Sequence, residues 1–361
     1  MDNLEISFDE MTKDNNVLWF CGTEVSGLFR IDLETGITSV ECFFPDDNKY
    51  AKKLYSGIVV HEDNVFAAPC NGYCIWRYNK KEKQFYGLKL QNLEENGEYI
   101  YNALKKAGKY KDSIYFFPGR YSSIVKVDLN NYKVDYLDDW KIKNIVEGDQ
   151  NRVVFNNIHF NSVQGLCVLP SWRGSGGLLF DLEMNMFRQM DQLFSVDEIM
   201  DCVSIGNDSY AFTKKNSNIF STLGEKSVKT KVGEVDERFY FVVAGEECLL
   251  VPQVGNRIIV VDSNTGENRS IYTANIDENI KNSLFPAFVV EGEAVYIFSY
   301  YEQKLLIVNS NTWKVRELEL RYDEETKMKL QIRKELWLSK NIYFENKEYS
   351  IANLIDELKE I

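Results

Sequence analysis

The 361-residue sequence has little histidine and cysteine, and each shortage excludes a class of site. Only two histidines are present, His61 and His159, which leaves little material for a histidine-based metal site or a Ser-His-Asp arrangement. We interpret both as solvated residues of turns. The seven cysteines are an odd number at irregular spacing, which excludes a complete disulfide framework and indicates reduced, mostly buried thiols. Since no cofactor or metal motif is present, we expect neither.

Long apolar runs and a basic balance are also missing. No stretch approaches the roughly 18 uncharged apolar residues that cross a bilayer, and residues 1–5 lack the basic and apolar regions of a signal peptide. We therefore expect a cytoplasmic protein that does not bind a membrane. Acidic residues exceed basic ones by 55 to 42, for a net charge of −13, which argues against a nucleic-acid partner.

What the sequence does contain is a repeat. A short apolar strand that ends in Asp or Asn recurs about every 46 residues, a period typical of repeat architectures. The six clear copies are Gly27–Asp32, Cys74–Asn79, Ser123–Asp128, Gly177–Asp181, Arg257–Asp262 and Lys304–Asn309, and a weaker seventh is Asn218–Leu223. A polar turn and another strand follow most copies, and two strands precede them, so that each unit has four short antiparallel strands, A to D.

Proline supports this assignment independently, because it cannot donate to a strand ladder and therefore gathers at strand ends. Pro69, Pro118, Pro170 and Pro252 occupy equivalent positions, 10 or 11 residues before the final Asp or Asn of their units. We predict an all-β fold: a seven-bladed β-propeller of four-stranded antiparallel blades over residues 1–320, followed by a C-terminal tail over 321–361.

Two repeats read Ile31-Asp32-Leu33-Glu34-Thr35-Gly36 and Val261-Asp262-Ser263-Asn264-Thr265-Gly266. This pattern resembles the repeats of bacterial seven-bladed propellers of the YVTN and PQQ-like type. The sequence lacks the Gly-His and Trp-Asp pairs of WD40 blades, the double glycine of kelch blades and the Ser-x-Asp-x-Gly-x-Thr-Trp box of sialidases. The resemblance therefore implies an architecture and no particular activity.

The tail differs in composition from the repeats. Residues 323–340 favour a helix, 341–350 a hairpin, and the apolar residues of 351–361 fall along one helical face. We expect this amphipathic helix to dock on the propeller; the alternative is a helix that binds a partner or a second copy.

In such a propeller the B-to-C and D-to-A connections share one face, around the mouth of the central channel. The segments that follow the marker prolines differ in sequence and are enriched in basic and aromatic residues. We predict ligand-binding residues there: Glu24, Asn71, Arg120, Tyr121, Trp172, Arg173, Lys214, Lys215, Tyr300 and Tyr301. Arginine grips carboxylate or phosphate with two donors, and aromatic rings stack on sugars, so a small anion or a sugar is the expected ligand.

Two functions remain open. The first is a non-enzymatic binding or scaffold module that recognises a protein partner or a small anionic or sugar ligand through the loops of the channel mouth. The alternative is a propeller enzyme, a hydrolase or lyase of a carbohydrate or small anionic substrate, with Glu24 or a loop Asp acting beside Arg120 and Arg173.

Overall fold

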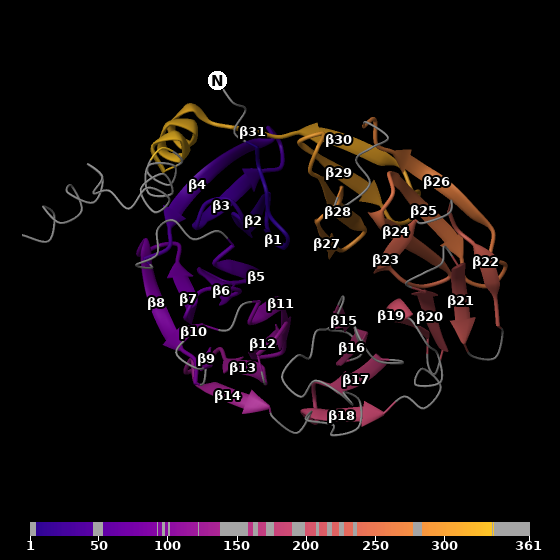
Figure 1. The fold of residues 1–361 in the computed structure, drawn as a ribbon, viewed down its shortest axis with the longest axis horizontal. Helices are drawn as coiled ribbons and strands as arrows, with labels where there is room; N and C mark the ends of the chain where they lie inside the picture. The colour runs from indigo at the N-terminus through magenta and orange to yellow at the C-terminus, as the bar shows by residue number, and fades with distance from the viewer. Residues whose placement is uncertain are drawn as a thin grey trace, which may run out of the picture.

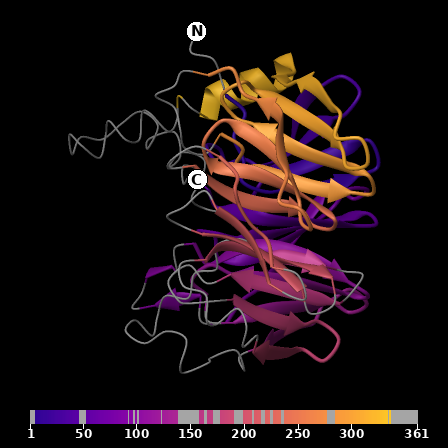
Figure 2. The same cartoon turned by 90° about the vertical axis from the view of Figure 1, so that its right-hand side faces the viewer.

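The computed structural model is a ring of seven four-stranded antiparallel blades, as predicted (Figure 1). It describes residues 5–45, 53–91, 93–95, 98–99, 102–121, 123–137, 158–161, 165–170, 177–189, 199–206, 209–214, 219–223, 227–233, 237–276, 284–333 and 335. Seen edge-on, the strands run along the ring axis (Figure 2).

The blades follow one another in chain order, each with its innermost strand first. Blade 1 comprises β1 (Met11–Asp14), β2 (Val17–Cys21), β3 (Gly27–Asp32) and β4 (Ile37–Phe43); blade 2 comprises β5 (Tyr55–His61), β6 (Asn64–Pro69), β7 (Cys74–Asn79) and β8 (Gln84–Lys89). After the short pair β9 (Glu94–Glu95) and β10 (Glu98–Tyr99), blade 3 comprises β11 (Leu104–Tyr110), β12 (Ser113–Pro118), β13 (Ile124–Asp128) and β14 (Val134–Leu137). Blade 4 comprises β15 (His159–Asn161), β16 (Leu166–Pro170), β17 (Gly177–Asp181) and β18 (Met186–Gln189), and blade 5 β19 (Ile199–Gly206), β20 (Ser209–Lys214), β21 (Ile219–Leu223) and β22 (Lys229–Lys231). Blade 6 comprises β23 (Arg238–Val243), β24 (Glu247–Val254), β25 (Arg257–Asp262) and β26 (Asn268–Thr273), and blade 7 β27 (Ala287–Glu291), β28 (Ala294–Ser299), β29 (Lys304–Asn309) and β30 (Val315–Glu319).

The core is divided among the junctions between blades. Among the described residues, seven clusters of buried side chains form, one at each junction. Side chains alternate between the two faces of a strand, so that Tyr115 and Phe117 of β12 pack toward blade 4, whereas Ile114 and Phe116 pack toward blade 2. Burial on both faces explains the nearly continuous apolar strands of the sequence.

The recurrent Asp or Asn has a local structural cause. In six blades its side-chain oxygen accepts hydrogen bonds from the backbone N–H groups two and three residues later, which closes the turn between strands C and D. The acceptors are Asp32, Asn79, Asp128, Asp181, Asp262 and Asn309. Blade 5, whose copy ends in Leu223, lacks this acceptor. Gly36 closes the blade 1 turn at a φ of 70°, a conformation that glycine adopts without strain.

The Asp262 turn gives a pH-dependent prediction. Its N–H donors from Thr265 and Asn264 lower the pKa of the Asp262 carboxyl. A carboxyl with a lowered folded-state pKa contributes stability above its unfolded pKa and loses it as the pH falls through the folded value. We expect Asp262→Ala to cost about 0.5–1 kcal/mol at neutral pH and less in acid, because this turn is exposed. Asp262→Asn keeps the acceptor oxygen and should cost less. Urea unfolding at neutral and acidic pH measures both variants, and a pH-independent cost of the alanine variant would contradict the assignment.

The ring closes without exchanging strands between its first and last blades. Blade 1 is built entirely from the N-terminal segment, and β31 (Arg321–Tyr322) joins it as an additional outermost strand, parallel to β4. A helix over 324–333 follows, with Thr326 N donating to the Asp323 side chain at its first turn (2.6 Å). Val40 N donates to Thr326 Oγ1 (2.9 Å), and Leu330 is buried in the core cluster shared by blades 1 and 7. The hairpin and amphipathic helix predicted after residue 340 lie outside the described residues.

Candidate functional site

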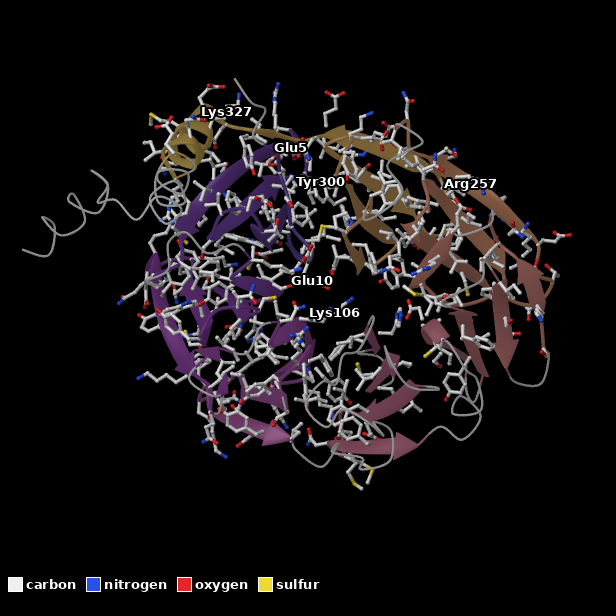
Figure 3. The ribbon with its side chains drawn as sticks, viewed as in Figure 1. Glu5, Glu10, Lys106, Arg257, Tyr300 and Lys327 are labelled. Carbon is white, nitrogen blue, oxygen red and sulfur yellow. The ribbon has the colours of Figure 1, made fainter. Side chains whose placement is uncertain are left out.

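A cavity of about 310 Å³ lies near the ring axis, at the face where the innermost strands begin. This is the face of the D-to-A and B-to-C connections, since each A strand begins there and each B strand ends there. Glu10 and Lys106 lie close together near the centre of the ring (Figure 3). Twelve residues from five blades line the cavity: Asp9, Glu10, Lys53, Ser56, Lys105, Lys106, Tyr240, Pro252, Gln253, Phe285, Pro286 and Phe288.

The lining has two chemically different walls. Blades 1, 2 and 3 and the segments that enter them supply only charged or polar side chains: Asp9, Glu10, Lys53, Ser56, Lys105 and Lys106. Blades 6 and 7 supply mostly apolar or aromatic ones: Tyr240, Pro252, Gln253, Phe285, Pro286 and Phe288. A molecule in this cavity would therefore meet lysines and carboxylates on one side and rings on the other.

A β-bulge directs two consecutive lysines into the charged wall. In the pairing of β11 with β12, Leu104 faces Pro118 and Lys106 faces Phe117, so that Lys105 is the extra residue. Neighbouring residues of a regular strand point to opposite faces, whereas both lysines line the cavity here. The register of β5 against β6 also shifts between Tyr55 and Ile58, in the segment that contains Ser56.

The charged groups of this wall are unequally paired. Lys53 forms an ion pair with Asp9, and Lys106 Nζ lies 3.8 Å from Glu10 Oε1 and 5.2 Å from the centroid of the Phe288 ring. Burial raises the pKa of Glu10, although Lys106 opposes this shift. Lys105 lacks an ion-pair partner within the described part of the chain, and burial followed by repulsion from Lys53 lowers its pKa.

A buried histidine and aspartate lie near the apolar wall. Asp201 of β19 is fully buried; its Oδ1 atom accepts hydrogen bonds from Cys202 N (2.9 Å) and from His159 Nε2 (2.7 Å), since a carboxylate only accepts. Its Oδ2 atom accepts from Phe241 N (2.8 Å), the residue after the cavity residue Tyr240. The interpretation of His159 as a solvated turn residue is wrong: it lies in β15, and its side chain is 13% exposed. His61, in contrast, ends β5 beside a turn.

Three of the predicted ligand-binding residues support the fold around the channel mouth. The Asn71 side chain donates to Lys53 O (3.0 Å) and so braces the segment that carries a cavity lysine. The buried Tyr121 hydroxyl donates to Gln91 O, and the Tyr300 hydroxyl donates to Glu5 Oε2 (2.6 Å). Figure 3 shows Tyr300 and Glu5 near the junction of blades 7 and 1.

The other predicted residues are not gathered in the cavity lining. Glu24 and Arg120 are exposed, and Tyr301 is 46% exposed. Trp172, Arg173 and Lys215 lie outside the described residues, as does the side chain of Lys214, which ends β20. None of the ten lines the cavity within the described part of the chain, and their role in binding stays a prediction.

The cavity lies at the face on which the ligand-binding residues were predicted, but other connections line it. The predicted residues belong to the B-to-C loops, whereas ten of the twelve lining residues come from the starts of the innermost strands and the segments before them. The available signal was the charged pair Lys105-Lys106, which interrupts the apolar start of a strand.

A metal centre finds no support in the described ranges, where no group of three or more His, Cys, Asp or Glu side chains is placed to hold an ion. All seven cysteines are described; each is a free thiol, and every one except Cys42 is buried. None of the described helical residues forms a helix with the length and hydropathy of a membrane span.

Comparisons with known proteins show the fold. No protein-family model matches the chain, and no curated protein does. Among solved structures, virginiamycin B lyase from Staphylococcus aureus is similar at 13% identity and a TM-score of 0.57, over 82% of this chain and 94% of that one. A catalytically inactive histidine-to-alanine variant of that lyase with quinupristin gives a TM-score of 0.60 at 13% identity, over 83% of this chain and 94% of that one. The extracellular domain of a one-component system from B. thetaiotaomicron gives 0.56 at 14% identity, over 86% of this chain and 41% of that one. At such identities the likeness establishes the propeller fold alone.

Proposed function

We propose that this propeller binds a small organic anion that also carries an apolar group, and that the central cavity is the binding site. The observation that carries the proposal is the division of one cavity into a lysine-containing wall and an aromatic wall. A volume of about 310 Å³ falls at the lower end of the range for small-molecule pockets.

The charges of the first wall favour an anion. It contains three lysines and two carboxylates, and Asp9 and Glu10 are each within ion-pair distance of a lysine. The lysines of this wall outnumber its carboxylates by three to two, so a ligand carboxylate would balance the remaining positive charge. The protein as a whole carries a net charge of −13, which makes this local arrangement of lysines distinctive.

The second wall favours an aromatic or other apolar group on the ligand. Phe285 and Phe288 contribute aromatic rings to this wall, and Pro252 and Pro286 add apolar surface. Gln253 lines the same wall, and its Oε1 atom is buried and accepts no hydrogen bond among the described residues. A hydroxyl or amine on the ligand would satisfy that acceptor.

A lyase or hydrolase acting on the same class of anion is the second candidate function. A raised carboxyl pKa at Glu10 and a lowered amine pKa at Lys105 bring an acid and a base closer to neutral pH within one cavity, as catalytic sites do. The similar virginiamycin B lyase shows that this fold supports a lyase. Recognition of a protein partner through the exposed loops, including Arg120 and Tyr301, remains a further proposal, as does a cytoplasmic location.

Calorimetric titration with phenyllactate tests the binding proposal, because this probe combines a carboxylate, a hydroxyl and a ring. Lactate lacks the ring and phenyllactamide lacks the charge, so we expect both to bind at least about tenfold more weakly. Lys105→Met should weaken phenyllactate binding by about tenfold or more, whereas Lys109→Met, on an exposed position of the same strand, should not. Equal affinity for the three probes, or equal effects of the two variants, would contradict the proposal.

A further inference from the structure

Lys105 differs from the two other lysines of the cavity in its surroundings. Lys53 is paired with Asp9, and Lys106 lies beside Glu10. Within the described residues Lys105 has no ion-pair partner, although the charges of Lys53, Asp9 and Glu10 act on its pKa from a longer distance. Burial, followed by repulsion from Lys53, lowers the pKa of Lys105 and so increases the share of the neutral amine.

The rest of the cavity suits chemistry at a neutral amine. A lysine becomes nucleophilic when it is desolvated or placed beside another cation, and the Lys105 bulge places it in that situation on a rigid inner strand. The partly buried Glu10 lines the same cavity, and burial raises its pKa, which favours the protonated form that can donate a proton. Phe285 and Phe288 supply apolar surface to the same cavity.

We propose that Lys105 forms an imine with a carboxylate ligand that carries an aldehyde or ketone group, such as a 2-oxo acid, bound in the cavity. This proposal rests on the proposed function and narrows its ligand class to carbonyl-containing anions. In this complex Lys53 and Lys106 bind the carboxylate of the ligand, and the apolar wall contacts the apolar group of the ligand.

The reaction is balanced without an oxidant or reductant. The neutral Lys105 Nζ attacks the carbonyl carbon, a C–N bond forms, and a proton moves from nitrogen to oxygen to give a carbinolamine. Glu10 donates a proton to the hydroxyl group, the C–O bond breaks, and one water molecule leaves. The product is a protonated imine, whose positive charge is balanced by the Glu10 carboxylate and the ligand carboxylate.

Reductive trapping tests the proposal. The protein is incubated with phenylpyruvate and sodium cyanoborohydride and then analysed by intact mass and peptide mapping. We expect one adduct per chain, with an added mass of one ligand less one oxygen atom, located at Lys105. Lys105→Arg cannot present a neutral amine and should reduce trapping by about tenfold or more. Lys109→Arg, on the same strand but exposed, should label like the wild type. Thermal unfolding of each variant confirms that it is folded.

The outcomes separate this proposal from the proposed function. Phenyllactate has no ketone or aldehyde that could form an imine, and its binding to the wild-type protein is measured in parallel. If phenyllactate binds and phenylpyruvate leaves no adduct at Lys105, the imine is overturned and the binding site stands. If neither probe binds, both proposals are overturned. Labelling spread equally over surface lysines such as Lys109 also overturns the imine, whereas selective loss of the adduct in Lys105→Arg supports it.

Discussion

Replacing Phe8 by alanine should lower the free energy of unfolding by about 3–5 kcal/mol, the usual cost of removing a fully buried phenylalanine. Phe8 is 0% exposed, and its ring stacks between Phe20 of blade 1, at a centroid distance of 4.1 Å, and Phe298 of blade 7, at 4.2 Å. The Phe8 side chain therefore joins the first and last blades at the point where the propeller closes. The midpoint of urea unfolding, followed by circular dichroism, measures the loss.

A second buried phenylalanine serves as a control that separates the loss of stability from a loss of ligand binding. Phe180 of β17 is also 0% exposed, but it packs at the junction of blades 3 and 4 and pairs with no strand that lines the cavity. Phe180→Ala should cost a similar free energy. Only Phe8→Ala should also weaken phenyllactate binding, because Asp9 and Glu10 follow it directly in the chain. Equal binding by the two folded variants would show that closure at Phe8 does not position the cavity.

The blades could be predicted because their sequence signals are local. The repeated Asp or Asn forms the same turn in six blades, so a short motif reports a short-range structure. The prolines are similarly local: Pro69, Pro118 and Pro170 end their strands, and Pro252 lies two residues before the end of β24.

The cavity could not be predicted because it depends on long-range geometry. A repeat period identifies which ends of the strands share a face, but not which side chains there reach the axis. The bulge at Lys105 adds one residue to a strand without any glycine or proline to mark it. The addition of β31 to the outer edge of blade 1 was equally hidden, because two residues carry no periodicity. His159 was misinterpreted for the same reason, since its partner Asp201 is 42 residues away.

Asp201→Ala should lower the free energy of unfolding by about 3–5 kcal/mol, which is the typical cost of removing one partner from a buried, hydrogen-bonded pair. The substitution leaves His159 Nε2 and two backbone N–H groups, those of Cys202 and Phe241, without their acceptor in the interior. Asp201→Asn should recover only part of the loss. Its NH₂ group must turn toward one of these donors, whichever way the amide is oriented.

A double-mutant cycle with His159→Ala shows whether the histidine and the carboxylate act together. For a direct contact at 2.7 Å we expect a coupling free energy of about 1–3 kcal/mol. His61→Ala is the matched control, because His61 ends β5 beside a turn, and its removal should change stability by no more than about 0.5 kcal/mol. Additive effects of the Asp201 and His159 substitutions would show that the aspartate instead stabilises blades 5 and 6 through its bonds to the backbone.

Since Phe241 N–H follows Tyr240, loss of that bond should also loosen the aromatic wall of the cavity, and Asp201→Ala should weaken phenyllactate binding more than His159→Ala does.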